Sequence, residues 1–197
     1  MISRFFFFIL IFFKNLFELI KLITSRTKKI KNMNKTAIYP GTFDPITYGH
    51  LDIITRATKI FDSITIAISN NFTKKPIFNL KERIELTRKV TLHLKNVKKI
   101  LGFNDLLANL AKKEKANILI RGVRTIFDFD YEIKLAAINK QIYPDLDSIF
   151  LLSSKEVSFI SSSFVKEIAK YKGDIKPYLP KEAHSALLRK LNNDSIK

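Results

Sequence analysis

Short apolar runs alternate along the chain with longer segments whose apolar residues recur at helical spacing. The short runs are rich in isoleucine and leucine and end at polar clusters, which is typical of buried strands. Strands are expected over residues 36–39, 63–68, 97–101, 117–120 and 148–152. Since strands that alternate with helices form parallel sheets covered on both faces, the pattern predicts an α/β fold with a doubly wound, five-stranded parallel sheet.

Capping signals mark the expected starts of the helices. Thr47 is a predicted N-cap, and Asn79 with Glu82 three residues later resembles a capping box. Asn104 or Asp105 is expected to cap the next helix. Helices are predicted over residues 48–61, 80–94, 106–115 and 129–142, and a further one is expected from residue 164.

The length and composition favour one globular domain. A chain of 197 residues, 46% of them hydrophobic, suits a single core. It contains no cysteine, which excludes disulfides, thiolate metal sites and cysteine nucleophiles, and we expect a cytoplasmic location. The net charge of +17 invites a nucleic-acid role, but the basic residues are scattered among acids rather than gathered with aromatics. We therefore expect no nucleic-acid partner; polyanionic small molecules explain part of the charge.

Residues 1–32 differ in composition from the rest of the chain. Their unbroken apolar run, residues 5–13, is shorter than the about 20 residues that span a bilayer, and no small-residue cleavage site follows it. We expect no stable membrane insertion. Because Met33 stands just before the first strand, we interpret 1–32 as an upstream start artefact and 33–197 as the single domain. A membrane-surface segment and a cleaved signal are the alternatives.

The loop after the first strand, YPGTFDPITYGH over residues 39–50, carries most of the functional information. Pro40 and Pro45 restrict it, while its glycines let the backbone approach a ligand closely. A helix capped by Thr47 places His50 one turn inside, where free N–H groups and the helix dipole favour an anion. The sequence therefore predicts a phosphate-binding loop with an imidazole positioned to donate to a phosphate oxygen.

Other polar clusters also follow predicted strands, where ligands bind in such folds. Arg121 and Arg124 flank a glycine, and arginine suits a bidentate grip on phosphate, although two solvated arginines in a turn would look the same. The serines of residues 160–163 precede a helix, where serine is also the ordinary cap. Lys74 is either a phosphate-binding cation or a surface lysine, and Glu132 either contacts a ribose or base or faces water.

The segments GTFDP (41–45) and TYGH (47–50) resemble the signature of the T-x-G-H nucleotidyltransferases. With KKP (74–76), IRGVR (120–124), DYE (130–132) and SFISSS (158–163) in the same order, the chain resembles the bacterial phosphopantetheine adenylyltransferases over residues 35–191. This ordered set separates it from relatives that act on nicotinate mononucleotide or glycerol phosphate. The resemblance implies a Rossmann-like fold of the nucleotidyltransferase type.

The resemblance also assigns roles to residues. His50 is expected to be catalytic, as a transition-state stabiliser, together with Lys74 and Arg124. The residues expected to face 4′-phosphopantetheine are Thr42, Lys74, Leu107 and Arg121. Those expected to face ATP are Thr42, Phe43, His50, Gly122, Val123, Arg124, Glu132, Val157, Ser158, Phe159, Ile160, Ser161, Ser162 and Ser163. Val157 and Leu107 depart from the commonest pattern, an aromatic and a methionine respectively, which leaves the details of adenine and pantetheine contact open.

The reaction implied is transfer of the adenylyl group of ATP to 4′-phosphopantetheine, which gives dephospho-coenzyme A and pyrophosphate in coenzyme A biosynthesis. Mg²⁺ is expected with the ATP phosphates rather than in a protein site, because no carboxylate cluster suggests a cage. The resemblance further implies a homohexamer. A different class of function, a basic surface-binding protein that has lost catalysis and uses its apolar N-terminus on membranes, is the alternative that the intact loops argue against.

Overall fold

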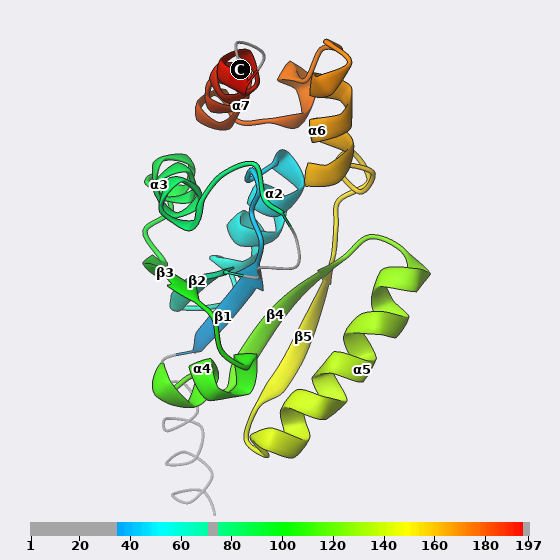
Figure 1. Ribbon diagram of the computed structural model, residues 1–197. Coiled ribbons are helices and arrows are strands. Elements are labelled where there is room, and N and C mark those ends of the chain that lie inside the picture. The colour runs from blue at the N-terminus through cyan, green and yellow to red at the C-terminus, as the bar shows by residue number, and fades with distance from the viewer. Residues whose placement is uncertain (1–34, 71–74, 195–197) are drawn as a thin grey trace, which may run out of the picture. The chain divides into compact units, whose positions relative to one another are not determined.

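Five parallel strands form one sheet at the centre of the domain in the computed structural model, which describes residues 35–70 and 75–194 (Figure 1). The strand order is β3-β2-β1-β4-β5, so the winding reverses at the central strand. This confirms the predicted α/β fold with a doubly wound, five-stranded parallel sheet. The strands are β1 (Thr36–Gly41), β2 (Ser63–Ser69), β3 (Val97–Phe103), β4 (Ile118–Val123) and β5 (Asp147–Leu152).

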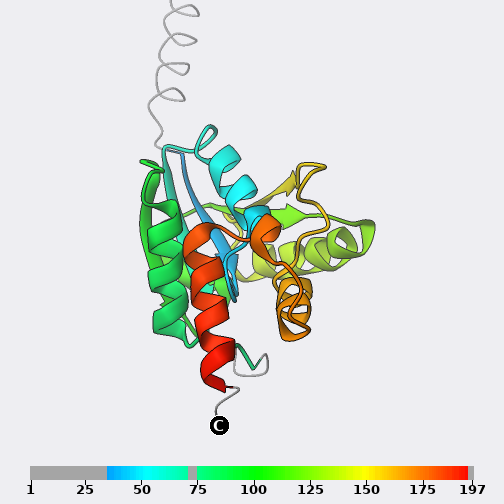
Figure 2. The same ribbon diagram turned by 90° about the horizontal axis from the view of Figure 1, so that it is seen from above.

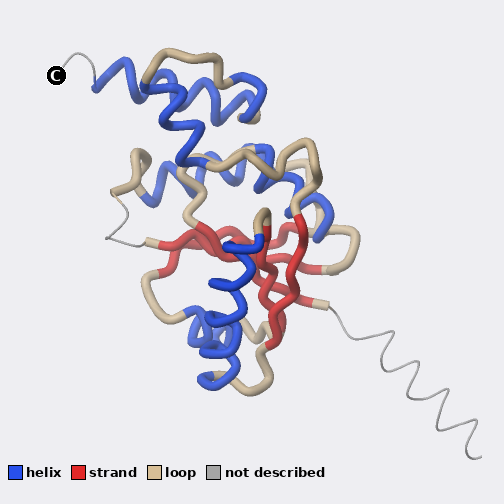
Figure 3. Tube along the Cα trace, turned by 90° about the vertical axis from the view of Figure 1, so that its right-hand side faces the viewer, coloured by secondary structure: helices blue, strands red, loops and turns tan. Residues whose placement is uncertain are grey.

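Helices cover both faces of the sheet, as the side view in Figure 3 shows. Four helices pack over one face: α2 (Tyr48–Ala57), α3 (Leu80–Thr91), α6 (Ser162–Lys170) and α7 (Lys181–Asp194). The other face carries α4 (Leu107–Lys113) and α5 (Ile126–Ile142). A short 3-10 helix, η1 (Lys176–Tyr178), precedes α7, which lies beside α3 (Figure 2). Each face of the sheet has its own hydrophobic core, and alternate residues of a strand point to opposite faces. In β1, Ala37 and Tyr39 belong to the larger core and Ile38 to the smaller one.

Local capping signals predicted some helix starts and missed others. Thr47 and Asn79 are confirmed as N-caps, each within a complete capping box. The predicted cap of α4 is wrong: Leu106 is the N-cap without a side-chain bond, and the Asp105 carboxylate accepts the Leu106 N–H at 2.6 Å instead. Helix α5 begins three residues earlier than predicted because the Thr125 side chain caps it, and α7 was not predicted.

Strand β4 is longer than the sequence predicts. The predicted strand ends at residue 120 and a turn follows, whereas Arg121, Gly122 and Val123 pair with β5 opposite Phe150, Leu151 and Leu152. The pairing holds the backbone of Arg121 and Gly122 in a strand ladder, so these residues are placed by the sheet rather than by a loop.

The predicted N-terminal extension, residues 1–32, lies outside the described residues. Within the part of the chain that the structure describes, no helix has both the length and the apolar character needed to cross a membrane.

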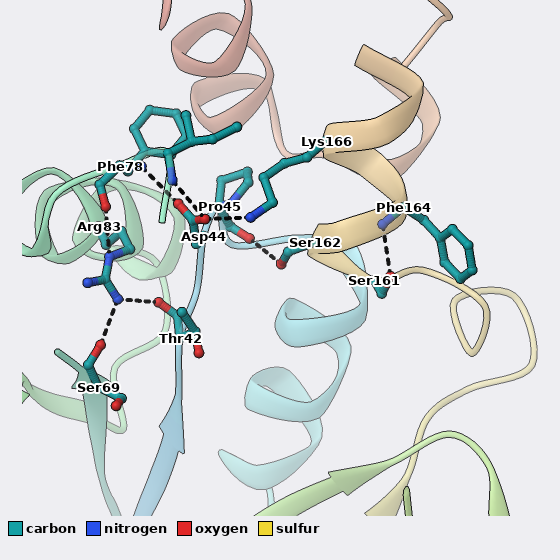
Figure 4. A network of polar contacts seen from close by, with 11 residues as sticks. Thr42, Asp44, Pro45, Ser69, Phe78, Arg83, Ser161, Ser162, Phe164 and Lys166 are labelled. Carbon is teal, nitrogen blue, oxygen red and sulfur yellow. Dashed lines mark hydrogen bonds and ion pairs between the residues drawn. The ribbon is translucent and has the colours of Figure 1, made fainter. Parts of the chain in front are cut away.

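A network of buried polar contacts fastens the loops at the carboxyl edge of the sheet (Figure 4). The Asp44 side chain, which is 3% exposed, accepts the N–H of Phe78 at 2.9 Å and that of Ile77 at 3.1 Å. It also forms an ion pair with Lys166 of α6 at 2.6 Å. Beside it, the Ser162 hydroxyl donates to the carbonyl of Pro45 at 2.8 Å. The loop after β1 is therefore tied to the segment before α3 and to the start of α6.

Arg83 of α3 ties the same loop to the end of β2. Its side chain is buried, and the Nη1 group donates to the carbonyls of Thr42 and Ser69 at 2.8 Å each. Its Nε group donates to the carbonyl of Phe78 at 3.0 Å. Since these carbonyls belong to three separate segments, one guanidinium fixes their relative positions.

Replacement of Arg83 by methionine should lower the free energy of unfolding by about 3 kcal/mol or more, because three carbonyl groups lose their donor at about 1–3 kcal/mol for each unsatisfied group. Arg88→Met is the matched control on the same helix, since the Arg88 side chain is 55% exposed and pairs with Glu85. It should change the value by about 0.5 kcal/mol at most. Urea unfolding followed by circular dichroism measures both variants, and equal midpoints would contradict the role given to Arg83.

Candidate functional site

A cleft of about 760 Å³ opens at the carboxyl edge of the sheet. Residues at or just after the ends of all five strands line it, namely Gly41, Ser69, Phe103, Arg124 and Ser153. The first turns of α2 and α6 border it as well. This is where parallel sheets of this class bind ligands, because the strand ends and the helix N-termini meet there.

Most of the residues predicted for the site line this cleft. They come from β1 and its loop, α2, α4, β4, α5 and the start of α6, and they are Thr42, Phe43, His50, Leu107, Arg121, Gly122, Arg124, Glu132, Ile160, Ser161, Ser162 and Ser163. Phe43 borders the cleft with a buried side chain, whose ring packs against His50 with the centroids 4.9 Å apart.

Five predicted residues have a different placement. Lys74 lies outside the described residues. Val123, Val157, Ser158 and Phe159 do not line the cleft: the Val123 side chain is buried at the end of β4, and the Phe159 ring packs edge-on against Tyr178. Their contact with ATP stays a prediction.

The capping box of α2 orients the His50 ring. The backbone N–H of Thr47 donates to Nδ1 of His50 at 3.1 Å, and the Thr47 side-chain oxygen lies 3.0 Å from the same atom. Because Nδ1 accepts a hydrogen bond, the proton of the neutral ring belongs on Nε2. His50 therefore presents an N–H donor away from its own helix start.

His50 is uncharged at neutral pH. Burial lowers its pKa from 6.5 to about 4, and the positive charge of Arg124 adds to this effect. The side chain thus acts as a hydrogen-bond donor at the positive end of the α2 dipole without carrying a charge of its own.

Both arginines of the predicted phosphate-binding pair are held by carboxylates of α5. Arg121 donates from Nε to Glu132 at 2.5 Å and from Nη2 to the other carboxylate oxygen, and both side chains are largely buried. Arg124 pairs with Asp128 at 3.2 Å in the first turn of the helix. The ion pairs fix the guanidinium planes and leave further N–H donors of each group for a ligand.

Two of the three serines at the start of α6 make hydrogen bonds within the protein, and the third faces the cleft without one in the part of the chain that the structure describes. Ser161 is the N-cap, and its side chain accepts the N–H of Phe164 at 3.1 Å. Ser162 donates to Pro45, as described above. Among the described residues the Ser163 side chain has no hydrogen-bond partner, and it lines the cleft. The α6 N-terminus therefore offers one unpaired hydroxyl and free backbone N–H groups to an anion.

Sequence reasoning missed several residues of the cleft. Asp44 and Lys166 form the ion pair beneath it, and Tyr131 and Leu135 of α5 line its wall. Tyr39 also lines the cleft, although its position in an apolar strand predicts only a role in the core. The position of Asp44 inside the GTFDP segment was the signal available for this residue.

The carboxylates of the cleft do not assemble a metal site. Across residues 35–70 and 75–194, no group of three or more histidine, aspartate and glutamate side chains could hold a metal ion. Asp44 is engaged by Lys166 and two backbone N–H groups, and Glu132 by Arg121. A metal ion that enters with a nucleotide would find its oxygen ligands on the phosphates and in water.

Comparisons with known proteins agree with this geometry. A family profile described as cytidylyltransferase-like matches residues 38–168. The phosphopantetheine adenylyltransferase of Buchnera aphidicola subsp. Schizaphis graminum (strain Sg) is 82% identical over 161 residues, which cover 82% of this chain and 98% of that protein.

Two solved structures share the fold. The nicotinic acid mononucleotide adenylyltransferase of Plasmodium falciparum complexed with APC has a TM-score of 0.58 at 18% identity and covers 80% of this chain and 95% of its own. A putative nicotinate-nucleotide adenylyltransferase from Vibrio parahaemolyticus has a TM-score of 0.57 at 19% identity, with coverage of 81% and 93%. At these identities the likeness concerns the fold alone, but the 82% identical relative and the family profile go further. They confirm the predicted family: the chain belongs to the phosphopantetheine adenylyltransferases, a family of nucleotidyltransferases.

Proposed function

We propose that this chain transfers the adenylyl group of ATP to 4′-phosphopantetheine, with dephospho-coenzyme A and pyrophosphate as products. The observation that carries the proposal is the convergence in one cleft of the T-x-G-H helix start, two carboxylate-held arginines and the serine-capped start of α6. Family membership supplies the identity of the acceptor.

The reaction needs no nucleophile from the protein. An oxygen of the phosphopantetheine phosphate, already an anion at neutral pH, attacks the α-phosphorus of ATP. The bond from the α-phosphorus to the bridging oxygen breaks, and pyrophosphate leaves with the electron pair. Catalysis then rests on in-line positioning and on stabilising the charge of the transition state.

The side chains of the cleft divide these tasks. His50 donates from Nε2 to an oxygen of the reacting phosphate, where a preorganised neutral donor at a helix N-terminus stabilises developing charge. Arg121 holds the phosphate of the acceptor, with Leu107 beside the pantetheine chain, and Thr42 contacts both substrates. Arg124 and the start of α6 hold the departing pyrophosphate. Lys74, which lies outside the described residues, remains a prediction as a cation that acts on the reacting oxygens together with the neutral His50.

Mg²⁺ belongs to the proposal as a companion of ATP. It would enter with ATP and neutralise part of the phosphate charge, and the paired carboxylates of the cleft would leave its coordination to phosphate oxygens and water. The cytoplasm, where ATP is made, is the proposed location.

A homo-oligomer, a hexamer by family resemblance, is also proposed. No described residue of α5 is fully buried, and Ile126 and Phe127 are 85% and 88% exposed. Leu152 at the end of β5 is 71% exposed. Apolar surface of this kind marks an interface, and a second copy of the chain would cover it. Sedimentation velocity of the full chain tests this, with a monomer as the contradicting result.

Pyrophosphate release from Mg-ATP, measured with 4′-phosphopantetheine, with nicotinate mononucleotide and without acceptor, tests the reaction. We expect release with 4′-phosphopantetheine alone. Pyrophosphate release with nicotinate mononucleotide instead would show that the proposed acceptor is wrong. No release with any acceptor would favour a basic surface-binding protein without catalysis.

Replacement of His50 by glutamine should lower kcat by about 10²–10³, the usual cost of one lost donor to the transition state. The thermal midpoint should stay close to that of the native chain, because glutamine three residues after a threonine N-cap completes a capping box. His50→Ala is the comparison variant and should lose both turnover and part of the stability. Near-normal turnover of the glutamine variant would remove His50 from the mechanism.

The stability of the free protein should fall as the pH drops from 6.5 toward about 4. In this range the unfolded chain takes up a proton on His50 that the folded protein resists, so protonation favours unfolding. Burial would raise the pKa values of Asp52 and Glu82, but hydrogen bonds from their neighbours lower both below the ordinary 3.8 and 4.5, so the unfolded carboxyls take up protons mainly below about pH 5.5 and the range from 6.5 to about 5.5 isolates His50 from them. Urea midpoints across that range should decline less steeply in His50→Gln, and parallel curves would contradict the lowered pKa.

A further inference from the structure

Tyr39 stands near the end of β1, directly under the site. Its side chain is 6% exposed and belongs to the larger core, and its ring packs edge-on against Phe43 with the centroids 5.5 Å apart. The same residue lines the cleft. Tyr39 is therefore an apolar core residue that carries one polar atom toward the ligand site.

The structure gives the hydroxyl of Tyr39 no hydrogen-bond partner within residues 35–70 and 75–194, and its oxygen is not among the buried side-chain atoms that lack one. The ring is buried but the oxygen opens to the cleft, so it is free to pair with a ligand atom. Burial also raises the pKa of Tyr39 well above its ordinary value, against the opposing charges of Arg121 and Arg124, so the group keeps its proton. What remains is a protonated, unpaired donor at the wall of the cleft.

Gly122 leaves room beside this hydroxyl. A Cβ atom at Gly122 would lie 3.4 Å from the Tyr39 oxygen and 3.2 Å from Cγ1 of Ile53 in α2. A side chain at position 122 would therefore press on Ile53 and lie in contact with the Tyr39 oxygen, whereas glycine leaves the space beside that oxygen to a ligand.

The charges around the hydroxyl favour an anionic ligand atom. The guanidinium groups of Arg121 and Arg124 act on Tyr39 from β4 and the residue after it, and the first turn of α2 lines the same cleft. Two carboxylates, Asp52 and Glu132, act in the opposite sense, but each is engaged by an arginine. An oxygen that carries negative charge is the complement of a donor in this position.

We propose that the Tyr39 hydroxyl donates a hydrogen bond to a phosphoryl oxygen of the bound nucleotide, between Gly122 and the start of α2. This rests on the proposed function, since the nucleotide is taken to be ATP. Tyr39 thereby becomes a substrate-contacting residue that leaves a hydroxyl unpaired in the free protein and pairs it in the complex.

The isosteric variant Tyr39→Phe tests the proposal because it keeps the ring in the core. Its kcat/KM for ATP should fall about tenfold to hundredfold, the range for a lost hydrogen bond to a charged group. The KM for 4′-phosphopantetheine should stay within twofold. The thermal midpoint of the ligand-free variant should stay close to that of the native chain, since the hydroxyl bonds to no described protein group, whereas a structural role would lower it.

Tyr143→Phe is the matched control. The Tyr143 hydroxyl donates to Asn117 at 2.8 Å, away from the cleft, so its removal should leave the ATP constants unchanged and should not raise the midpoint. Unchanged ATP constants in Tyr39→Phe, or an effect confined to 4′-phosphopantetheine, would overturn the proposal while the native chain stays active. Inactivity of the native chain with every acceptor would instead overturn the proposed function, and ATP binding by calorimetry would then still decide whether Tyr39 contacts the nucleotide.

Discussion

The Asp44 carboxylate and the Arg83 guanidinium are taken out of water at the carboxyl edge of the sheet, which costs free energy unless their polar atoms find partners. Asp44 finds two backbone N–H groups and Lys166, and Arg83 finds three carbonyl groups. Because those partners belong to the loop after β1, the end of β2, the segment before α3 and α6, no single loop can shift without exposing or orphaning a charge. The shape of the cleft follows from this requirement.

Three cations of the cleft are paired with carboxylates of the protein. Arg121, Arg124 and Lys166 are each paired with a carboxylate, while α2 and α6 add partial positive charge through their N-termini. The donors are therefore held in place by the protein rather than by water. A phosphate that enters meets groups that need little reorganisation, which is the condition for electrostatic catalysis.

Features that depend on residues close together in the chain could be predicted from the sequence, whereas contacts between residues far apart in the chain could not. Thr47 and Asn79 could be predicted as caps because their partners lie three residues away. Arg83 could not be singled out, because it bonds Thr42, which is 41 residues away in the chain. Likewise the strand at Arg121 continues only because β5 pairs with it. The cleft residues carried by the T-x-G-H loop were predictable from their spacing, but the pairing of Arg121 with Glu132 and the open hydroxyl of Tyr39 depend on packing.

The capping box of α2 has a consequence for how this chain can change over time. Position 50 is constrained twice, once by the helix that begins there and once by the donor it offers to the cleft. Most replacements would damage both, so selection for folding also disfavours them. Glutamine and glutamate are the exceptions, since either residue completes the capping box but removes the imidazole donor from the cleft. A descendant with glutamine at this position would be a sign of a domain retained for its fold after its chemistry had been given up.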